Sequence, residues 1–273
     1  MEQTVAKSRH GWLQVAALVA VTIALPVQAE ELAYAYAGAS GRQLLAPREL
    51  TAAPRVQQAL CPGNELLTIR FTGIQAGDAR RDTGRASSEN FERQAGQLFG
   101  LTDGEVSEGD VCLLAPPEFF RAREPLPFEP LLAREDQRDE CSEALRGRIA
   151  AARKRPLTGC WPVAVIGDED GVYVVLFERR GPDALAALVL DRGGRLAFRD
   201  YPGNTTDESS VWRVDDGGVF DPGAFDILFA IEGPQGVELG VEWAGAEGAN
   251  VTLLQADGAL LRERLAAYFY RAP

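Results

Sequence analysis

The sequence predicts a mainly β, α+β protein with two disulfides. In this fold class, a mixed α/β N-terminal region precedes a C-terminal antiparallel β-meander that closes as a barrel or folds as a sandwich. Two observations carry the prediction. Beyond residue 160, short apolar runs alternate with turns rich in Asp and Gly. The chain also holds four cysteines, an even number, behind an N-terminal export signal.

Residues 1–29 have the three-part pattern of a secretory signal peptide. Two cations precede an apolar run from residue 12 to residue 25, and small residues lead up to Ala29. We expect cleavage after Ala29 and a mature protein in the periplasm or outside the cell. The apolar run is shorter than the ~20 residues that a spanning helix needs, and no later run is apolar enough. No integral membrane segment is therefore expected after cleavage.

Residues 30–130 are expected to form the mixed α/β region. Residues 66–71, LLTIRF, nearly alternate apolar and polar side chains, which predicts a strand. Residues 87–90, SSEN, resemble a helix start, and apolar residues then recur at helical spacing up to Gly100. Residues 115–130 contain five of the 16 prolines. This density predicts extended chain along the surface of a folded region, with neither helix nor central strand.

Residues 131–160 are expected to form a helix inside a disulfide loop. On a helical wheel, Cys141, Leu145, Ile149 and Ala152 form an apolar stripe. Five cations accompany the stripe: Arg146, Arg148, Arg153, Lys154 and Arg155. The last three complement the negative end of the helix dipole, which favours a structural helix. The alternative is a membrane-surface helix, which would bind anionic vesicles and release them at high salt.

Residues 161–273 are expected to form the antiparallel β-domain. Apolar runs joined by short turns predict three hairpins, namely 162–166 with 172–177, 184–190 with 195–201, and 225–231 with 237–243. A further run at 251–255 leads through an Asp-Gly turn into a final segment that ends at Tyr270. The composition of this segment favours a helix, but the preceding turn favours a strand with Leu261, Leu265 and Phe269 on one face.

The four cysteines are Cys61, Cys112, Cys141 and Cys160. In an exported chain they predict two disulfides, and three pairings are possible. The sequential pairing, Cys61–Cys112 with Cys141–Cys160, is the one we favour. A zinc site would need close ligand spacing such as C-x₂-C, which this chain lacks.

Charge and histidine content exclude several function classes. The chain has 28 basic and 40 acidic residues, and removing residues 1–29 leaves 26 and 39, a net charge of −13. Such a surface repels nucleic acid and anionic lipid, so no nucleic-acid partner is expected. The single histidine, His10, lies in the signal peptide. The mature chain therefore cannot use Ser-His-Asp or Cys-His catalysis or a His-ligated metal.

Acidic and aromatic side chains supply the remaining candidates for a site. Candidate calcium ligands lie in the turn at 168–170 and at Asp215, Asp216, Asp221 and Asp226. Neither stretch has EF-hand spacing, and Asp and Gly are ordinary turn residues, so no metal, cofactor or catalytic residue is assigned. Seven aromatic residues can line a barrel mouth or fill its core, and a core role is favoured: Trp161, Tyr173, Tyr201, Trp212, Trp243, Tyr268 and Tyr270.

Together these observations predict an exported, non-catalytic cell-envelope protein that binds a partner or ligand through its β-domain. The alternative is a periplasmic hydrolase that works through carboxylates, with or without calcium. The absence of histidine from the mature chain favours the binding protein. A cleft in which acidic side chains converge would favour the hydrolase.

Overall fold

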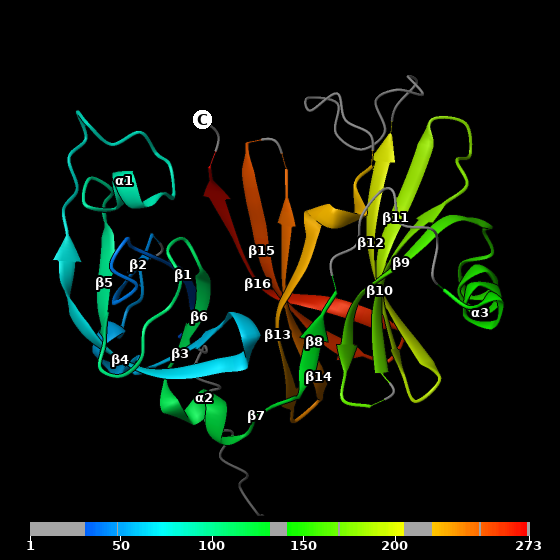
Figure 1. Ribbon diagram of the computed structural model, residues 1–273, viewed down its shortest axis with the longest axis horizontal. Helices are drawn as coiled ribbons and strands as arrows, with labels where there is room; N and C mark the ends of the chain where they lie inside the picture. The colour runs from blue at the N-terminus through cyan, green and yellow to red at the C-terminus, as the bar shows by residue number, and fades with distance from the viewer. Residues whose placement is uncertain are drawn as a thin grey trace, which may run out of the picture.

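The protein consists of a closed six-stranded barrel and a curled ten-stranded sheet that lie side by side (Figure 1). The computed structural model describes residues 31–47, 49–131, 141–168, 170–204, 220–245 and 247–271. Strands dominate, their neighbours are antiparallel except for one short parallel contact between residues 198 and 260, and two disulfides are present, so the predicted fold class is confirmed. The expected signal peptide, residues 1–29, lies outside the described residues.

The barrel is formed by the N-terminal region. Its strands are β1 (Ala33–Ala37), β2 (Gln43–Ala46), β3 (Gln58–Cys61), β4 (Glu65–Gln75), β5 (Gly96–Leu101) and β6 (Val111–Ala115), in the order β1-β2-β5-β4-β3-β6. Small side chains of β1, together with larger ones such as Phe99, fill the interior. The Cys61–Cys112 disulfide joins β3 to β6 within this core. The single-turn segments η1 (Ala53–Arg55) and η2 (Pro62–Asn64) flank β3.

The expected helix up to Gly100 is wrong beyond its first turn. Helix α1 spans only Ser88–Phe91, and the chain then forms β5, which pairs with β2 and β4. Both edges of β5 thus gain backbone hydrogen bonds, which outweigh the helical spacing of its apolar residues. At Gly96 a Cβ atom would lie 2.7 Å from the carbonyl oxygen of Ala46, so glycine permits this close approach of β2 and β5.

The curled sheet contains the three predicted hairpins and the predicted final strand. Its strands are β7 (Glu124–Pro125), β8 (Phe128–Pro130), β9 (Leu157–Ile166), β10 (Asp170–Phe177), β11 (Asp183–Arg192), β12 (Arg195–Asn204), β13 (Phe225–Gly233), β14 (Gly236–Ala244), β15 (Gly248–Asp257) and β16 (Leu260–Tyr270). The order is β7-β13-β14-β15-β16-β12-β11-β10-β9-β8. A single-turn segment, η3 (Pro222–Ala224), precedes β13.

The proline-rich segment partly follows its prediction. Strands β7 and β8 pair with β13 and β9, so both strands are extended and form the two edges of the curled sheet. The expectation of no helix is wrong, because α2 spans Pro117–Arg121. Pro116 and Pro117 occupy the N-cap and first helical positions, where a missing N–H costs no intrahelical hydrogen bond.

Two β-bulges change which side chains face the barrel. The pairing of β16 with β15 shifts between Leu253 and Leu254, which leaves Arg264 as an extra residue in β16. Leu261 therefore packs inside the curled sheet, whereas Leu265 and Phe269 pack on its outer face. The expectation that these three residues share one face is wrong, because the bulge inverts the alternation. A similar shift at Leu228 places Phe229 on the outer face of β13.

This outer face joins the two β-structures through a continuous apolar core. Phe229, Leu253 and Phe269 of the curled sheet pack with Tyr36 and Leu113 of the barrel. The rings of Tyr36 and Phe269 meet edge-to-face with centroids 6.0 Å apart. Because the interface is a buried apolar core, the barrel and the sheet are held in a fixed relation.

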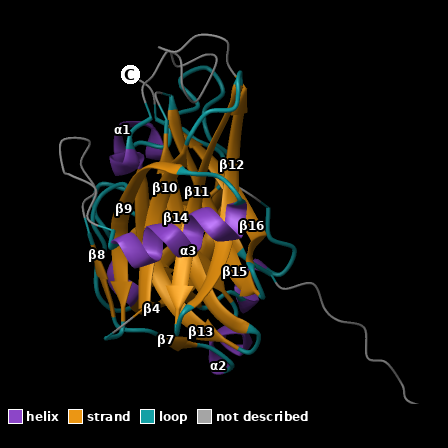
Figure 2. Cartoon of the chain, turned by 90° about the vertical axis from the view of Figure 1, so that its right-hand side faces the viewer, coloured by secondary structure: helices purple, strands orange, loops and turns teal. Residues whose placement is uncertain are grey.

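Helix α3 (Glu143–Arg153) lies across the outer face of the curled sheet (Figure 2). Ser142 caps it by accepting a hydrogen bond from the N–H of Leu145. Leu145 and Ile149 are buried against the sheet, as the helical wheel predicted. Ala152, which the wheel placed in the same apolar stripe, is exposed, so the face of the helix that contacts the sheet is narrower than predicted. The Cys141–Cys160 disulfide ties the start of the helix to β9.

The cations of α3 are bound to the sheet beneath it. Arg148 makes two hydrogen bonds of 2.8 Å to Asp191. Arg153 bonds Asp200 at 2.6 Å and lies over the ring of Phe198. Arg155 is buried and donates to two backbone carbonyl oxygens. These contacts attach the helix to the sheet.

Candidate functional site

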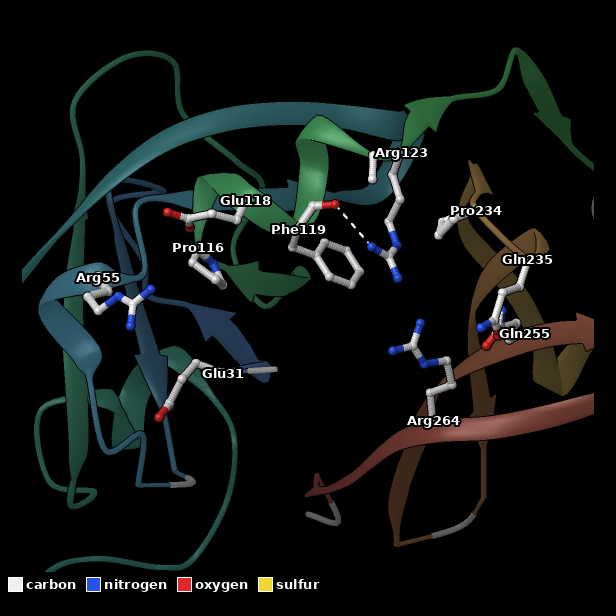
Figure 3. Close-up of a pocket in the computed structure, with 11 residues that line it drawn as sticks. Glu31, Arg55, Pro116, Glu118, Phe119, Arg123, Pro234, Gln235, Gln255 and Arg264 are labelled. Atoms are coloured by element: carbon white, nitrogen blue, oxygen red, sulfur yellow. Dashed lines mark hydrogen bonds between the residues drawn. The ribbon is translucent and has the colours of Figure 1, made fainter. Parts of the chain in front are cut away.

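A cleft of about 700 Å³ opens between the barrel and the curled sheet (Figure 3). The barrel side contributes Glu31 before β1, Arg55 of η1 and Glu118 of α2. The sheet side contributes Gln235 of the β13–β14 turn and Arg264 of β16. The volume suits a small-molecule ligand, and the lining is rich in polar groups.

A buried ionic cluster forms one wall of the cleft. Both oxygens of Glu238 are bound by Arg123, with Nε–Oε2 at 2.8 Å and Nη2–Oε1 at 3.0 Å. Arg264 adds a hydrogen bond of 2.8 Å from Nη1 to Oε1. The side chain of Glu238 is fully buried and that of Arg123 is 5% exposed, whereas that of Arg264 is 25% exposed. Arg264 is therefore the member of the cluster that a ligand can reach.

Each member of the cluster is positioned by a local feature of the chain. Arg123 follows α2, where its guanidinium stacks 3.7 Å from the ring centroid of Phe119 and bonds the Phe119 carbonyl oxygen. Glu238 lies in β14, where alternation turns its side chain away from the interior of the curled sheet. Arg264 is the extra residue of the β16 bulge, and in Figure 3 its guanidinium points into the cleft. Bulges are a common means of redirecting a side chain beside a site.

Tyr34 adds a buried polar atom near the cluster. Its side chain is 2% exposed, and its hydroxyl has no hydrogen-bond partner among the described residues. Burial, reinforced by the charge of Glu238, raises the pKa of Tyr34 well above its ordinary value. Tyr34 is therefore neutral at physiological pH and does not change the charge of the cluster.

Both walls of the cleft carry charged and polar side chains. Arg123 and Arg264 lie on the wall with the ionic cluster, and Arg55, Glu31 and Glu118 lie on the opposite wall. Uncharged donors and acceptors lie beside the ionic cluster, where Gln255 bonds Gln235 at 2.9 Å. The lining therefore suits a polar molecule.

The described acidic residues among the sequence candidates do not line this cleft. Asp221 accepts a hydrogen bond from the N–H of Gly223 and caps η3. Asp226 lies opposite Glu242 in the β13–β14 pair, and burial raises the pKa of both carboxyls. Asp215 and Asp216 lie outside the described residues. Within the described ranges, no group of three or more His, Cys, Asp or Glu side chains could hold a metal ion.

In the candidate stretch 168–170, Asp170 at the start of β10 is held by a hydrogen bond and an ion pair. It accepts a hydrogen bond from the N–H of Gly193 at 3.0 Å and pairs with Arg192 at 3.2 Å. Residue 169 lies outside the described ranges. Both contacts of Asp170 reach the β11–β12 hairpin, so this side chain links two neighbouring hairpins of the curled sheet.

Several of the aromatic residues pack together in the curled sheet. Phe225 stacks on Trp243 with centroids 5.6 Å apart, and Tyr201 contacts both rings edge-to-face. This packing agrees with the favoured core role. Tyr268 differs, being 49% exposed, and Trp212 lies outside the described residues.

Sequence reasoning missed Arg123, Glu238 and Arg264. They are far apart in the chain, and arginine is frequent throughout it. Glu238 looks like an ordinary outward-facing residue of β14, because the sequence does not reveal that the barrel covers that face. The uniform spacing of Leu261, Leu265 and Phe269 also concealed the bulge that aims Arg264.

Comparison with protein-family models, curated proteins and solved structures finds no match to this chain. In the described part of the chain, no helix has both the length and the apolar character needed to cross a membrane.

Proposed function

We propose that this protein is an exported, non-catalytic binding protein of the cell envelope, and that it binds a small polar ligand in the cleft between the barrel and the curled sheet. The observation that carries the proposal is the cluster of Arg123, Glu238 and Arg264 on the cleft wall. Export rests on the signal-like residues 1–29 and on the two disulfides, which form in oxidising compartments.

The cluster supports binding better than hydrolysis. A carboxylate that acts as a nucleophile or general base needs an oxygen that can approach the substrate. Both oxygens of Glu238 are held by guanidinium groups, and the side chain is fully buried. This arrangement holds the side chains of the wall in place and suits recognition of a ligand. The hydrolase is the alternative outcome of the test described next.

The test compares two variants that place a tryptophan in different hollows. Ala122 is exposed and lines the cleft, so Ala122→Trp should obstruct it. Ala259 is also exposed and lines a second hollow of about 870 Å³ at the hairpin turns of the curled sheet. Ala259→Trp is therefore the matched control. Melting curves of both variants should match that of the unmodified protein.

The mature protein is incubated with a small-molecule extract of the producing cells, desalted, and examined by native mass spectrometry. We expect the unmodified protein and Ala259→Trp to retain a compound that Ala122→Trp does not retain. The absence of any bound compound, or equal retention by Ala122→Trp, would refute the proposal. Turnover of a glycan or ester panel that Ala122→Trp abolishes would support the hydrolase instead.

A further inference from the structure

We propose that the hollow of about 870 Å³ at the hairpin turns of the curled sheet, the turn hollow, is a second ligand site, which takes a single-chain amphiphile with an anionic head group. Its volume lies within the range of small-molecule sites. The turn hollow lies among the turns of the hairpins β11–β12, β13–β14 and β15–β16. Of the described residues, only Gln235 lines both the turn hollow and the cleft, so the proposal does not rest on the proposed function.

The turn hollow lies where the ladder of the curled sheet is incomplete. Strands β12 and β16 run parallel and pair at one register position, Phe198 with Leu260. The residues of β12 before that position, 195–197, pair with β11 alone. Arg195 and Ala197 belong to this part of β12, and both line the turn hollow. The missing neighbour of β12 therefore gives a ligand access to the interior face at this end of the sheet.

The floor of the turn hollow is apolar. Leu190, Ala197 and Val237 line it and belong to the buried core inside the curled sheet. Ala256 packs against the same core, and the exposed Ala259 lines the turn hollow at the β15–β16 turn. The turn hollow thus continues the apolar interior of the sheet, whereas the cleft has a largely polar lining. An alkyl chain that lies on this floor leaves water for apolar surface, which favours its binding.

Two arginines near the β11–β12 turn carry the positive charge of the rim. Arg192 is held by protein carboxylates, because it pairs with Asp170 at 3.2 Å and with Glu232 at 2.6 Å. Arg195 is exposed and makes no hydrogen bond or ion pair with the described side chains. Strand alternation places Arg195 on the same face of β12 as Ala197, which belongs to the interior core. The guanidinium of Arg195 can therefore bind the head group of a molecule whose chain lies on the floor.

The rim limits the head group to one negative charge. Arg195 supplies one cation, and Glu232, which also lines the turn hollow, disfavours a second anionic group. The apolar floor disfavours a wholly polar molecule of the kind proposed for the cleft. The ligand is therefore a fatty acid or another single-chain amphiphile with one negative charge.

The test measures binding to the mature protein by titration calorimetry. The probes are hexanoate, octanoate and decanoate, which differ only in chain length, and 1-decanol, which has the chain length of decanoate without its charge. We expect each added CH₂ group to tighten binding about two- to fourfold. Decanoate should bind at least about threefold more tightly than 1-decanol, because the ion pair with Arg195 is exposed to solvent.

Four variants locate the probe and its head group. Ala259→Trp fills the turn hollow and should weaken decanoate binding at least about tenfold, whereas Ala122→Trp obstructs the cleft and should not change it. Arg195→Gln should bind decanoate and 1-decanol alike and keep the dependence on chain length. Arg70→Gln is the matched control, because Arg70 is an exposed arginine of β4 that has no ion pair with the described residues and lines neither space. It should retain the preference for decanoate.

Ala259→Leu serves as the second variant if Ala259→Trp does not fold, and a smaller loss of decanoate binding is then expected. The proposal is refuted if decanoate does not bind, if hexanoate binds as tightly as decanoate, or if filling the turn hollow at Ala259 leaves decanoate binding unchanged. It is also refuted if Arg195→Gln retains the preference for decanoate over 1-decanol. Loss of decanoate binding in Ala122→Trp would place the probe in the cleft and refute the proposal as well.

The outcomes separate this proposal from the proposed function. An amphiphile from the cell extract that Ala259→Trp loses and Ala122→Trp retains would support the site in the turn hollow alone. A polar compound that Ala122→Trp loses, together with no binding of decanoate, would support the proposed function and refute the site in the turn hollow.

Discussion

The two arginine clusters of this protein differ in how deeply their ion pairs are buried. On α3, Arg148 and Arg153 each meet their own carboxylate on the sheet, Asp191 and Asp200, at positions reached by solvent. Beside the cleft, two arginines share one fully buried carboxylate, Glu238. The first cluster attaches a helix to the surface of the sheet. The second fixes side chains in the wall between the barrel and the curled sheet.

This difference shows that a high local density of cations is a poor indicator of a site. Five cations crowd the sequence between residues 146 and 155, yet the three described above are used in contacts with the sheet. The cleft cluster draws its members from three separate segments of the chain and is not visible as a basic patch in the sequence. Burial by tertiary neighbours, and not density along the chain, separates the two clusters.

The largest effect is expected from Glu238→Ala. Removing the shared carboxylate takes away the partner of the buried guanidinium of Arg123 and leaves it beside the partly exposed one of Arg264, so the free energy of unfolding should fall by about 3–5 kcal/mol. Urea denaturation measures this loss. Glu263→Ala is the matched control, because it breaks the solvent-exposed pair with Arg199 and should cost less than about 1 kcal/mol. Similar losses of unfolding free energy in both variants would contradict the view that the buried ion pairs of Glu238 matter more for stability than an exposed ion pair.

The next effect concerns the disulfide that holds the start of α3. Replacing both Cys141 and Cys160 with serine removes a link across 19 residues, and the unfolded chain gains entropy worth about 3 kcal/mol. We expect the melting temperature to fall. Ligand binding in the cleft should persist, because the disulfide joins the residue before the N-cap of α3 to β9 and neither cysteine lines the cleft. An unchanged melting temperature would mean that the arginine contacts alone hold the helix in place.

The sequence predicted the local features of the fold well. The hairpins between β9 and β16 follow from apolar runs joined by short turns. The residues that specify each hairpin are close together in the sequence, so the sequence alone reveals them. The helix up to Gly100 was wrong because β2 and β4, distant in the chain, recruit that segment as β5. The site could not be predicted, because its position depends on the packing of the barrel against β13 and β16 and on the bulge at Arg264.

The smallest effect is expected from Arg148→Gln, which removes the bidentate pair with Asp191. The hydrogen bonds to Asp191 raise the pKa of Arg148 above its ordinary value. Arg148 therefore stays charged at every pH below that ordinary value, and raising the pH within this range does not remove the stability that the ion pair contributes. Salt is the better test, since about 1 M salt shortens the screening length to ~3 Å. Arg148→Gln should cost less than about 1 kcal/mol in low salt and still less in high salt.

Retention of the cleft ligand should not change in Arg148→Gln, because Arg148 pairs with Asp191 and does not line the cleft. Native mass spectrometry of the desalted protein, as for Ala122→Trp, checks this. If Arg148→Gln lost the retained compound as Ala122→Trp does, the α3 cations would contribute to ligand binding, and the separation between the two clusters would be wrong. If it weakened binding to vesicles of anionic lipid instead, α3 would be a membrane-surface helix.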